Sequence, residues 1–304
     1  RALALDRRGV LWVGTASGLD RLRSDGRGFE HVALASAGAA APPVAVTALH
    51  VDDADTLWIG AADGLRTLAG DRVGVHVFAG AEGVPADLVK AILADRDGVL
   101  WVGTAASGVL RGSDRNRRFV AYRHEAVDRH SLADDNIDAL FQDRTGTLWI
   151  GTHTAGISTI DLASGGFERF AGLGGASGSN AGDKIYAIAA DRAGRIWLGT
   201  VGGGLLRMDR GSDAVLGYQH RAGDAGSLPS DFVRAVHVDG DGRLWVGTDA
   251  GLATLEPGSD RFVLRPLDDA DPAARKIRQI VPRRAGGLWI GTEAGVYRYD
   301  PATG

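Results

Sequence analysis

Short apolar runs recur along the chain and are separated by polar turns. Residues 89–94 form one such run, which Asp95-Arg96-Asp97-Gly98 separates from a second run over 99–104. Apolar runs of this length, bounded by Asp and Gly, are typical of strands joined by tight turns. Two more segments, 108–111 and 118–122, complete a group of four predicted strands. We expect these four strands to form one antiparallel sheet.

This group occurs seven times, and a Leu/Ile-Trp-aliphatic-Gly motif marks each copy. An Asp lies six residues before the Trp in six copies, and a Gly lies two residues after it in all seven. A spacing of 43 to 48 residues between copies indicates a repeat architecture. The seven tryptophans of the chain are Trp12, Trp58, Trp101, Trp149, Trp197, Trp245 and Trp289.

The repeat predicts an all-β fold, a seven-bladed β-propeller with four antiparallel strands per blade. A single sheet of four strands cannot bury both faces, whereas radially packed sheets can; an open β-solenoid is the alternative. Each Trp is expected to fill the space between adjacent blades, and the Gly after it to permit close approach of two sheets. We expect one domain, 1–304, with blades over about 1–33, 46–80, 89–123, 137–170, 184–220, 232–266 and 276–304.

The seventh blade has only three predicted strands, at 277–281, 287–292 and 295–299. We expect its outermost strand to lie beyond Gly304, which leaves 296–299 as an exposed edge. The chain also begins at Arg1, inside a predicted first strand. We interpret the sequence as a fragment of a longer protein.

Composition and motifs exclude several classes of function. A net charge of −4 argues against a general nucleic-acid binder, and no apolar run is long enough for a transmembrane helix. Without cysteine there is no thiolate chemistry. No nucleophile elbow and no phosphate loop is present, so we assign no catalytic residue, cofactor or metal site.

The candidate ligand site is the face that carries the connectors between blades, because these connectors vary most in length and sequence. In each predicted first strand, one residue falls near the mouth of the axial channel, followed by Ala in six of seven copies. Because four of these seven residues are cationic, we expect an anionic or sugar-acid ligand bound by Arg, with a solvated rim as the alternative. The mouth positions are Arg1, Thr47, Lys90, Asp138, Tyr186, Arg234 and Arg278.

Individual residues add to this site. Tyr186 is expected to stack on a sugar ring. His153, in a turn one residue longer than its counterpart, is a candidate contact on the same face. Asn136 is another; it ends the run 134–136, which either caps a turn or ligates a cation, with capping favoured. Asp138 is the carboxylate on which an enzymatic interpretation depends.

Two histidines, His50 and His237, lie at equivalent places in first strands. We expect them to pack between blades rather than to bind metal.

The repeat Asp-x-x-Gly-x-Leu-Trp-Ile-Gly-Thr resembles the two-component regulator propeller repeat. The connector that contains Tyr122-Arg123-His124 and Ser131-Leu132 resembles that family's long blade connector, and 218–228 echoes it. The resemblance implies a periplasmic sensor region of an inner-membrane receptor with a histidine kinase or diguanylate cyclase output. It also implies a second propeller or a β-sandwich domain in the same chain, and often an oligosaccharide ligand.

We therefore expect a non-catalytic ligand-sensing propeller that recognises a saccharide or other small ligand on the connector face. Its partners would be the neighbouring domain of the same chain or a second copy in a homodimer, without nucleic acid and without direct membrane insertion. Two alternatives stay open. One is a structural or dimerisation propeller with the ligand site elsewhere; the other is an enzyme similar to the streptogramin lyase propellers.

Overall fold

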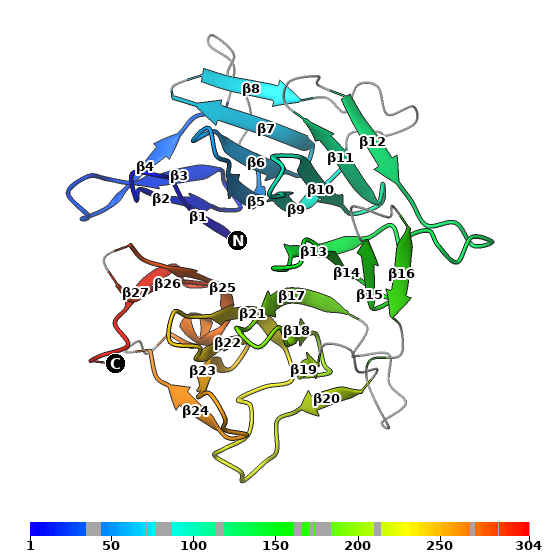
Figure 1. Ribbon diagram of the computed structural model, residues 1–304. Helices are drawn as coiled ribbons and strands as arrows, with labels where there is room; N and C mark the ends of the chain where they lie inside the picture. Colours follow the sequence, from blue (N-terminus) through cyan, green and yellow to red (C-terminus); the bar gives the residue numbers. More distant parts are fainter. Residues whose placement is uncertain are drawn as a thin grey trace. The chain divides into compact units, whose positions relative to one another are not determined.

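The computed structural model describes residues 1–34, 44–70, 72–76, 87–113, 118–160, 166–170, 173, 184–209, 214–267, 271–284 and 286–303. The described residues form seven antiparallel sheets, β1 to β27 in chain order, in which every strand pairs with its neighbours in sequence (Figure 1). Six sheets have four strands and the last has three. This is a seven-bladed β-propeller, as predicted. The expected blade end at residue 80, and residue 304, lie outside the described residues.

The described chain divides into two compact units, Arg1–Leu140 and Phe141–Gly304, and the division falls within β13. The expectation of a single domain stays a prediction. The strands up to the division are β1 (Ala2–Leu5), β2 (Leu11–Gly14), β3 (Leu19–Leu22), β4 (Phe29–Val32), β5 (Val46–Val51), β6 (Leu57–Ala61), β7 (Gly64–Ala69), β8 (Arg72–His76), β9 (Val89–Ala94), β10 (Leu100–Thr104), β11 (Val109–Ser113), β12 (Arg118–Tyr122) and β13 (Ile137–Gln142). The later strands are β14 (Leu148–Thr152), β15 (Ile157–Ile160), β16 (Phe167–Phe170), β17 (Ile185–Ala190), β18 (Ile196–Thr200), β19 (Leu205–Met208), β20 (Val215–Tyr218), β21 (Val233–Val238), β22 (Leu244–Thr248), β23 (Gly251–Leu255), β24 (Phe262–Arg265), β25 (Ile277–Pro282), β26 (Leu288–Thr292) and β27 (Val296–Tyr299).

The repeated Asp organises the turn between the first two strands of a blade. Oδ1 of Asp95 accepts the backbone N–H of Asp97 at 3.0 Å and of Val99 at 2.8 Å. Its Oδ2 accepts the indole N–H of Trp101 at 2.8 Å, a contact that the sequence did not predict. The same indole-to-carboxylate bond occurs in all six repeats that have the Asp. In the seventh, the guanidinium carbon of Arg283 lies 5.1 Å from the ring centroid of Trp289.

The core lies between consecutive sheets, where the tryptophans were expected. Trp58 is 2 % exposed and packs with Val89, Leu100 and Phe119 of the following sheet. The Gly two residues after each Trp permits this approach: a Cβ on Gly247 would lie 2.4 Å from Cγ2 of Ile277 in the next first strand. The prediction for Trp is confirmed in five repeats, whereas Trp149 and Trp289 are only half-buried. The prediction for Gly is confirmed at the six positions before the last blade.

A register break occurs one residue into five first strands. In β5, β9, β17, β21 and β25 one residue is skipped in the pairing with the second strand, as in a β-bulge. A bulge leaves its extra residue unpaired and re-aims its side chain. The extra residues are Thr47, Lys90, Tyr186, Arg234 and Arg278. Five of the seven candidate mouth positions are therefore set by bulges, which alternation of apolar and polar residues does not reveal.

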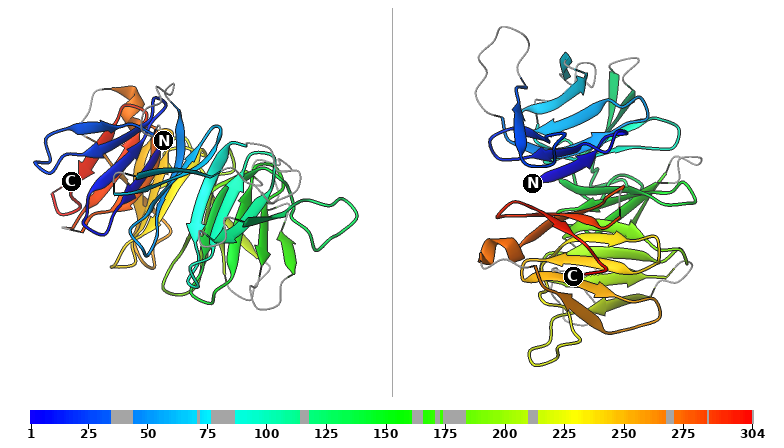
Figure 2. Two further views of the ribbon diagram at one scale, coloured as in Figure 1. Left: turned by 90° about the horizontal axis from the view of Figure 1, so that it is seen from above. Right: turned by 90° about the vertical axis from the view of Figure 1, so that its left-hand side faces the viewer.

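The last sheet ends at β27, which pairs with β26 alone among the described strands, so the predicted edge is present. Figure 2 shows β25 to β27 from two further directions, beside the short helix Pro272–Arg275 that precedes β25. Tyr299 at the end of the edge strand is 5 % exposed, with its ring centroid 5.6 Å from that of Trp245. This contact covers one side of the edge strand.

Candidate functional site

The connectors and the turns between second and third strands lie together, as expected. Backbone N–H groups of Asp249 and Glu293, which directly follow β22 and β26, donate to the carbonyls of Phe232 and Lys276 in the preceding connectors. The bulge residues of β21 and β25 lie at this same end of the sheets. In these two blades the bulge residue of the first strand therefore lies near the residue that directly follows the second strand, and these residues form the candidate site.

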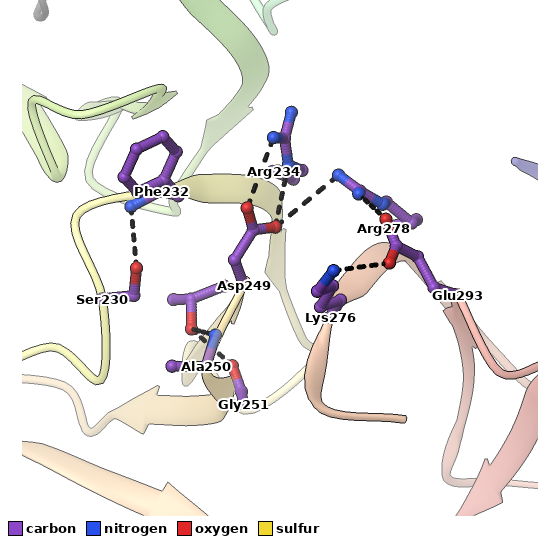
Figure 3. Close-up of polar contacts among 10 residues, drawn as sticks. Ser230, Phe232, Arg234, Asp249, Ala250, Gly251, Lys276, Arg278 and Glu293 are labelled. Carbon is purple, nitrogen blue, oxygen red and sulfur yellow. Dashed lines mark hydrogen bonds and ion pairs between the residues drawn. The ribbon is translucent and has the colours of Figure 1, made fainter. Parts of the chain in front are cut away.

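Arg234 and Asp249 form a two-point ion pair at this end of the second unit. Arg234 Nε lies 2.9 Å from Oδ1 of Asp249, and its NH2 lies 3.3 Å from Oδ2 (Figure 3). The planar guanidinium matches a carboxylate in this geometry, which fixes both side chains. Their side chains are 20 % and 26 % exposed, so the pair is accessible to solvent.

The pairing continues into the last blade. Arg278 NH1 lies 3.6 Å from Oδ1 of Asp249, so this carboxylate stands between two guanidinium groups (Figure 3). NH2 of Arg278 contacts Oε1 of Glu293, and Lys276 Nζ lies 2.9 Å from Oε2. Hydrogen bonds from Lys276 and Arg278 lower the pKa of Glu293 to about 2.

On the other side, the row reaches two aromatic rings. The guanidinium carbon of Arg234 lies 5.3 Å from the ring centroid of Tyr186, within range of a cation–π contact. The Tyr186 hydroxyl lies 3.5 Å from Nδ1 of His153. We call this continuous set the polar row; its members are His153, Tyr186, Arg234, Asp249, Arg278, Glu293 and Lys276.

The remaining predicted site residues lie in the first unit. Lys90 donates to Oδ1 of Asn136 at 2.8 Å and contacts Oδ1 of Asp138. The side chain of Asp138 is 1 % exposed. Thr47 donates to the carbonyl of Gly60 at 3.1 Å. Of the seven proposed ligand residues, the structure brings four together in the polar row and three together around Lys90.

The expected excess of positive charge is largely neutralised. The polar row holds three cations, Arg234, Arg278 and Lys276, against two carboxylates, Asp249 and Glu293. Ion pairs of this kind present donors and acceptors in alternation, and they hold their charges in place. Such an array suits a neutral ligand rich in hydroxyl groups better than a multiply charged anion.

Sequence reasoning missed Asp249, Glu293 and Lys276. The first two occupy one repeat position, four residues after the Trp, where His153 also lies. The other blades have Ala or Val at this position: Ala16, Ala62, Ala105 and Val201. Aligning this position across the repeats would have found both carboxylates.

Four segments of the sequence, 83–106, 131–154, 180–202 and 227–250, match the family model described as "Two component regulator propeller". Each segment holds one of the Trp motifs. Four of the seven repeats therefore resemble the repeat of this family. No curated protein matches the sequence.

Several solved structures share the fold of this chain. The extracellular domain of the putative hybrid two component system BT3049 from B. thetaiotaomicron has a TM-score of 0.71 at 22% identity, covering 85% of this chain and 34% of that one. The extracellular domain of the putative one component system BT4673 from the same organism has a TM-score of 0.75 at 20% identity, covering 97% of this chain and 37% of that one. The chain thus spans about a third of the length of these two domains. A streptogramin B lyase has a TM-score of 0.73 at 12% identity, covering 97% of this chain and 91% of that one.

Two long connectors between blades are built alike. Nδ1 of His124 lies 2.7 Å from the carbonyl of Leu132, and Asp135 accepts the backbone N–H of His124 at 2.6 Å. In the second copy the same two distances, 2.7 Å and 2.6 Å, join His220 to Leu228 and Asp231. A carbonyl only accepts, so Nδ1 carries the proton in both histidines. The run 134–136 also caps locally, since Oδ1 of Asp134 accepts the backbone N–H of Asn136 at 3.1 Å.

The two first-strand histidines lie within the propeller packing. Nε2 of His50 accepts the backbone N–H of Ala94 in the next blade at 3.2 Å. Burial lowers the pKa of His50 and of His237. Over the described ranges, no three metal-ligating side chains gather at one place, and no helix is long and apolar enough to cross a membrane.

Proposed function

We propose that this chain is an extracytoplasmic, non-catalytic ligand-sensing propeller of a membrane signal-transduction receptor with a histidine kinase or diguanylate cyclase output. The regulator propeller repeats support this proposal, as does the likeness to extracellular domains of two component systems. A periplasmic location and a neighbouring propeller or β-sandwich domain of the same chain belong to the same proposal.

We propose further that the polar row recognises a neutral saccharide. The observation that carries this is the bidentate pair of Arg234 with Asp249, which Arg278 continues toward Glu293. Alternating cationic and carboxylate groups can donate to and accept from neighbouring sugar hydroxyls. This refines the expectation of an acidic ligand from the sequence.

The enzymatic alternative has less support. The likeness to streptogramin B lyase rests on 12% identity and concerns the fold. A general acid or base must reach the reacting group, whereas Asp138 is buried and held by Lys90. The purely structural propeller stays as the alternative that the following experiment separates from ligand sensing.

The test is a thermal-shift screen of the chain against neutral and acidic oligosaccharides. A ligand that binds the folded state alone raises its stability by about 2.7 kcal/mol at 100 times Kd. We expect a shift with a neutral class, lost in Asp249→Asn. Glu256→Gln is the matched control, because Glu256 pairs with Arg243 at 2.6 Å outside the polar row. No shift with any saccharide, or an equal shift in Asp249→Asn, would refute saccharide binding at the polar row.

A further inference from the structure

Among the described residues, an arginine lies over the indole ring in five of the seven repeats. In some blades it comes from the third-strand residue that pairs with the Trp, as with Arg21 over Trp12 at 5.7 Å from the centroid. In others it comes from two residues before the Trp, as with Arg243 over Trp245 at 5.8 Å. The remaining pairs are Arg111 over Trp101, Arg195 and Arg207 over Trp197, and Arg283 over Trp289.

Trp149 has no such cover. Arginine comes from three positions in the other repeats, the third being that of Arg283, six residues before Trp289. In the fourth blade these positions hold Thr159, which pairs with Trp149, Thr147, two residues before it, and Asp143, six residues before it. Within the part of the chain that the structure describes, no cation lies over its ring. Trp58 also lacks an arginine at these positions, but it is 2 % exposed, whereas Trp149 is only half-buried.

A cavity of about 280 Å³ adjoins Trp149, between the fourth and fifth blades. Trp149, Phe170, Ile196 and Met208 form its apolar wall, and Glu168 also lines it. Four lining residues carry a carboxylate, Asp143, Glu168, Asp191 and Asp209, and Arg144 carries a guanidinium. Asp191 and Asp209 are in ion pairs with Arg195 and Arg207. The cavity therefore combines the ring of Trp149 with the carboxylate of Glu168. It lies at the Asp turns, the opposite end of the strands from the polar row.

In the first blade, an arginine side chain occupies the position equivalent to this cavity. There Trp12, Arg21 and Glu30 form one row across β2, β3 and β4. Arg21 covers the ring and its NH2 lies 2.9 Å from Oε2 of Glu30. One guanidinium thus contacts an indole and a carboxylate together.

The fourth blade repeats this row with its cation missing. Trp149, Thr159 and Glu168 pair across β14, β15 and β16 in the same register. The indole and the carboxylate are retained, and threonine replaces the arginine between them. The space adjoining the ring is the cavity rather than a side chain.

We propose that this cavity is a second ligand site, for a small organic cation with a guanidinium or primary ammonium group on a short apolar body. The cation would lie over Trp149 and toward Glu168, in the place that Arg21 takes in the first blade. The body would pack on Phe170, Ile196 and Met208. A cation over an indole is attracted by the quadrupole of the ring, and the carboxylate adds specificity for charge.

The probe is agmatine, which carries both cationic groups on a four-carbon body. Titration is followed by the seven indole N–H signals in a ¹H–¹⁵N spectrum, with Trp149 assigned through Trp149→Phe. We expect saturable binding that moves the Trp149 signal most, and none with 1,4-butanediol. Acetyl-Gly-Arg-Gly-amide shows whether a peptide arginine is accepted as well. Absence of saturation, or equal binding of the diol, would overturn the proposal.

Two variants test the geometry. Glu168→Gln is expected to weaken agmatine binding at least fivefold, while Glu30→Gln in the first blade leaves it unchanged. Thr159→Arg places a guanidinium between Trp149 and Glu168, as Arg21 lies between Trp12 and Glu30. It should abolish agmatine binding, because the arginine side chain would occupy the site. Affinity equal to the unmodified chain, in Glu168→Gln or in folded Thr159→Arg, would show that the cation does not lie between Trp149 and Glu168.

Discussion

The indole N–H of Trp101 donates a hydrogen bond to Oδ2 of Asp95 at 2.8 Å. The other oxygen of this buried carboxylate caps the turn between β9 and β10. One side chain thus joins the tight turn to the Trp that fills the core. The carboxylate lies among its three donors, so its negative charge is satisfied without a cation.

We expect Asp95→Ala to lower the free energy of unfolding by about 3 kcal/mol. The change removes three bonds to a charged acceptor and leaves the indole N–H of Trp101 buried without a partner. Asp97→Ala in the same turn is the control, because Asp97 is exposed. Urea unfolding measures both. Equal stability of the two variants would show that the Asp–Trp bond contributes nothing.

We expect Gly247→Ala to destabilise the chain by about 1–3 kcal/mol. The added Cβ would meet Ile277 Cγ2 at 2.4 Å and its Cβ at 2.8 Å, so the two blades must separate locally. Gly240→Ala is the matched control, because nothing lies within 4 Å of a Cβ there. If both variants unfold at the same urea concentration, close approach at Gly247 does not limit the packing.

We expect stability to fall as pH decreases from about 6.5, partly through His50. Burial lowers the pKa of this imidazole, so the unfolded chain binds a proton more readily than the folded chain. The contribution is complete above the unfolded pKa of about 6.5 and declines as pH falls toward the lowered folded pKa. Protonation would also remove the acceptor for Ala94.

His50→Gln should therefore flatten the loss of Tm between pH 7.5 and 5, measured by differential scanning calorimetry. His237 has the same direction of shift, so some pH dependence will remain. His130→Gln, at an exposed position, should leave the profile unchanged. An unchanged profile in His50→Gln would contradict a buried neutral imidazole.

We expect the Glu293 carboxyl to titrate at about pH 2, as seen by ¹³C NMR. Because its folded pKa lies below the unfolded value of about 4.3, it stabilises the fold above that pH. That stabilisation is lost as pH falls through the folded value of about 2. Lys276→Met should move the pKa upward, and high salt should do the same by screening. A pKa near 4.3 in the unmodified chain would show that the ion pairs do not persist in solution.

Much of the fold could be predicted from the sequence because local chemistry repeats. Asp95, Gly98 and Trp101 each act within a few residues of the chain, so their roles recur in register from copy to copy. Comparison of the repeats also predicted that the last blade has three strands in this sequence. Even Asp55, which replaces the turn glycine, has a positive φ of 62°, as that turn requires.

The candidate site could be predicted only in part. Tyr186, Arg234 and Arg278 were found because they share one place in the first strand. Their partners lie in other strands, and no local pattern relates Arg234 to Asp249, 15 residues later. The expectation of a cationic mouth came from counting the charged residues of the first strands alone. The carboxylates of Asp249 and Glu293, in the turns after the second strands, were not included.

The sequence by itself determined seven repeats, their strand order and the residues that fill the core, since each depends on contacts within one repeat or on burial. Only the tertiary structure decided where the charged side chains point. β-Bulges turn Arg234 and Arg278 toward the carboxylates after β22 and β26, and the register of three strands leaves Trp149 uncovered beside Glu168. These outcomes depend on how strands pair and how blades pack, and residues far apart in the chain set them together.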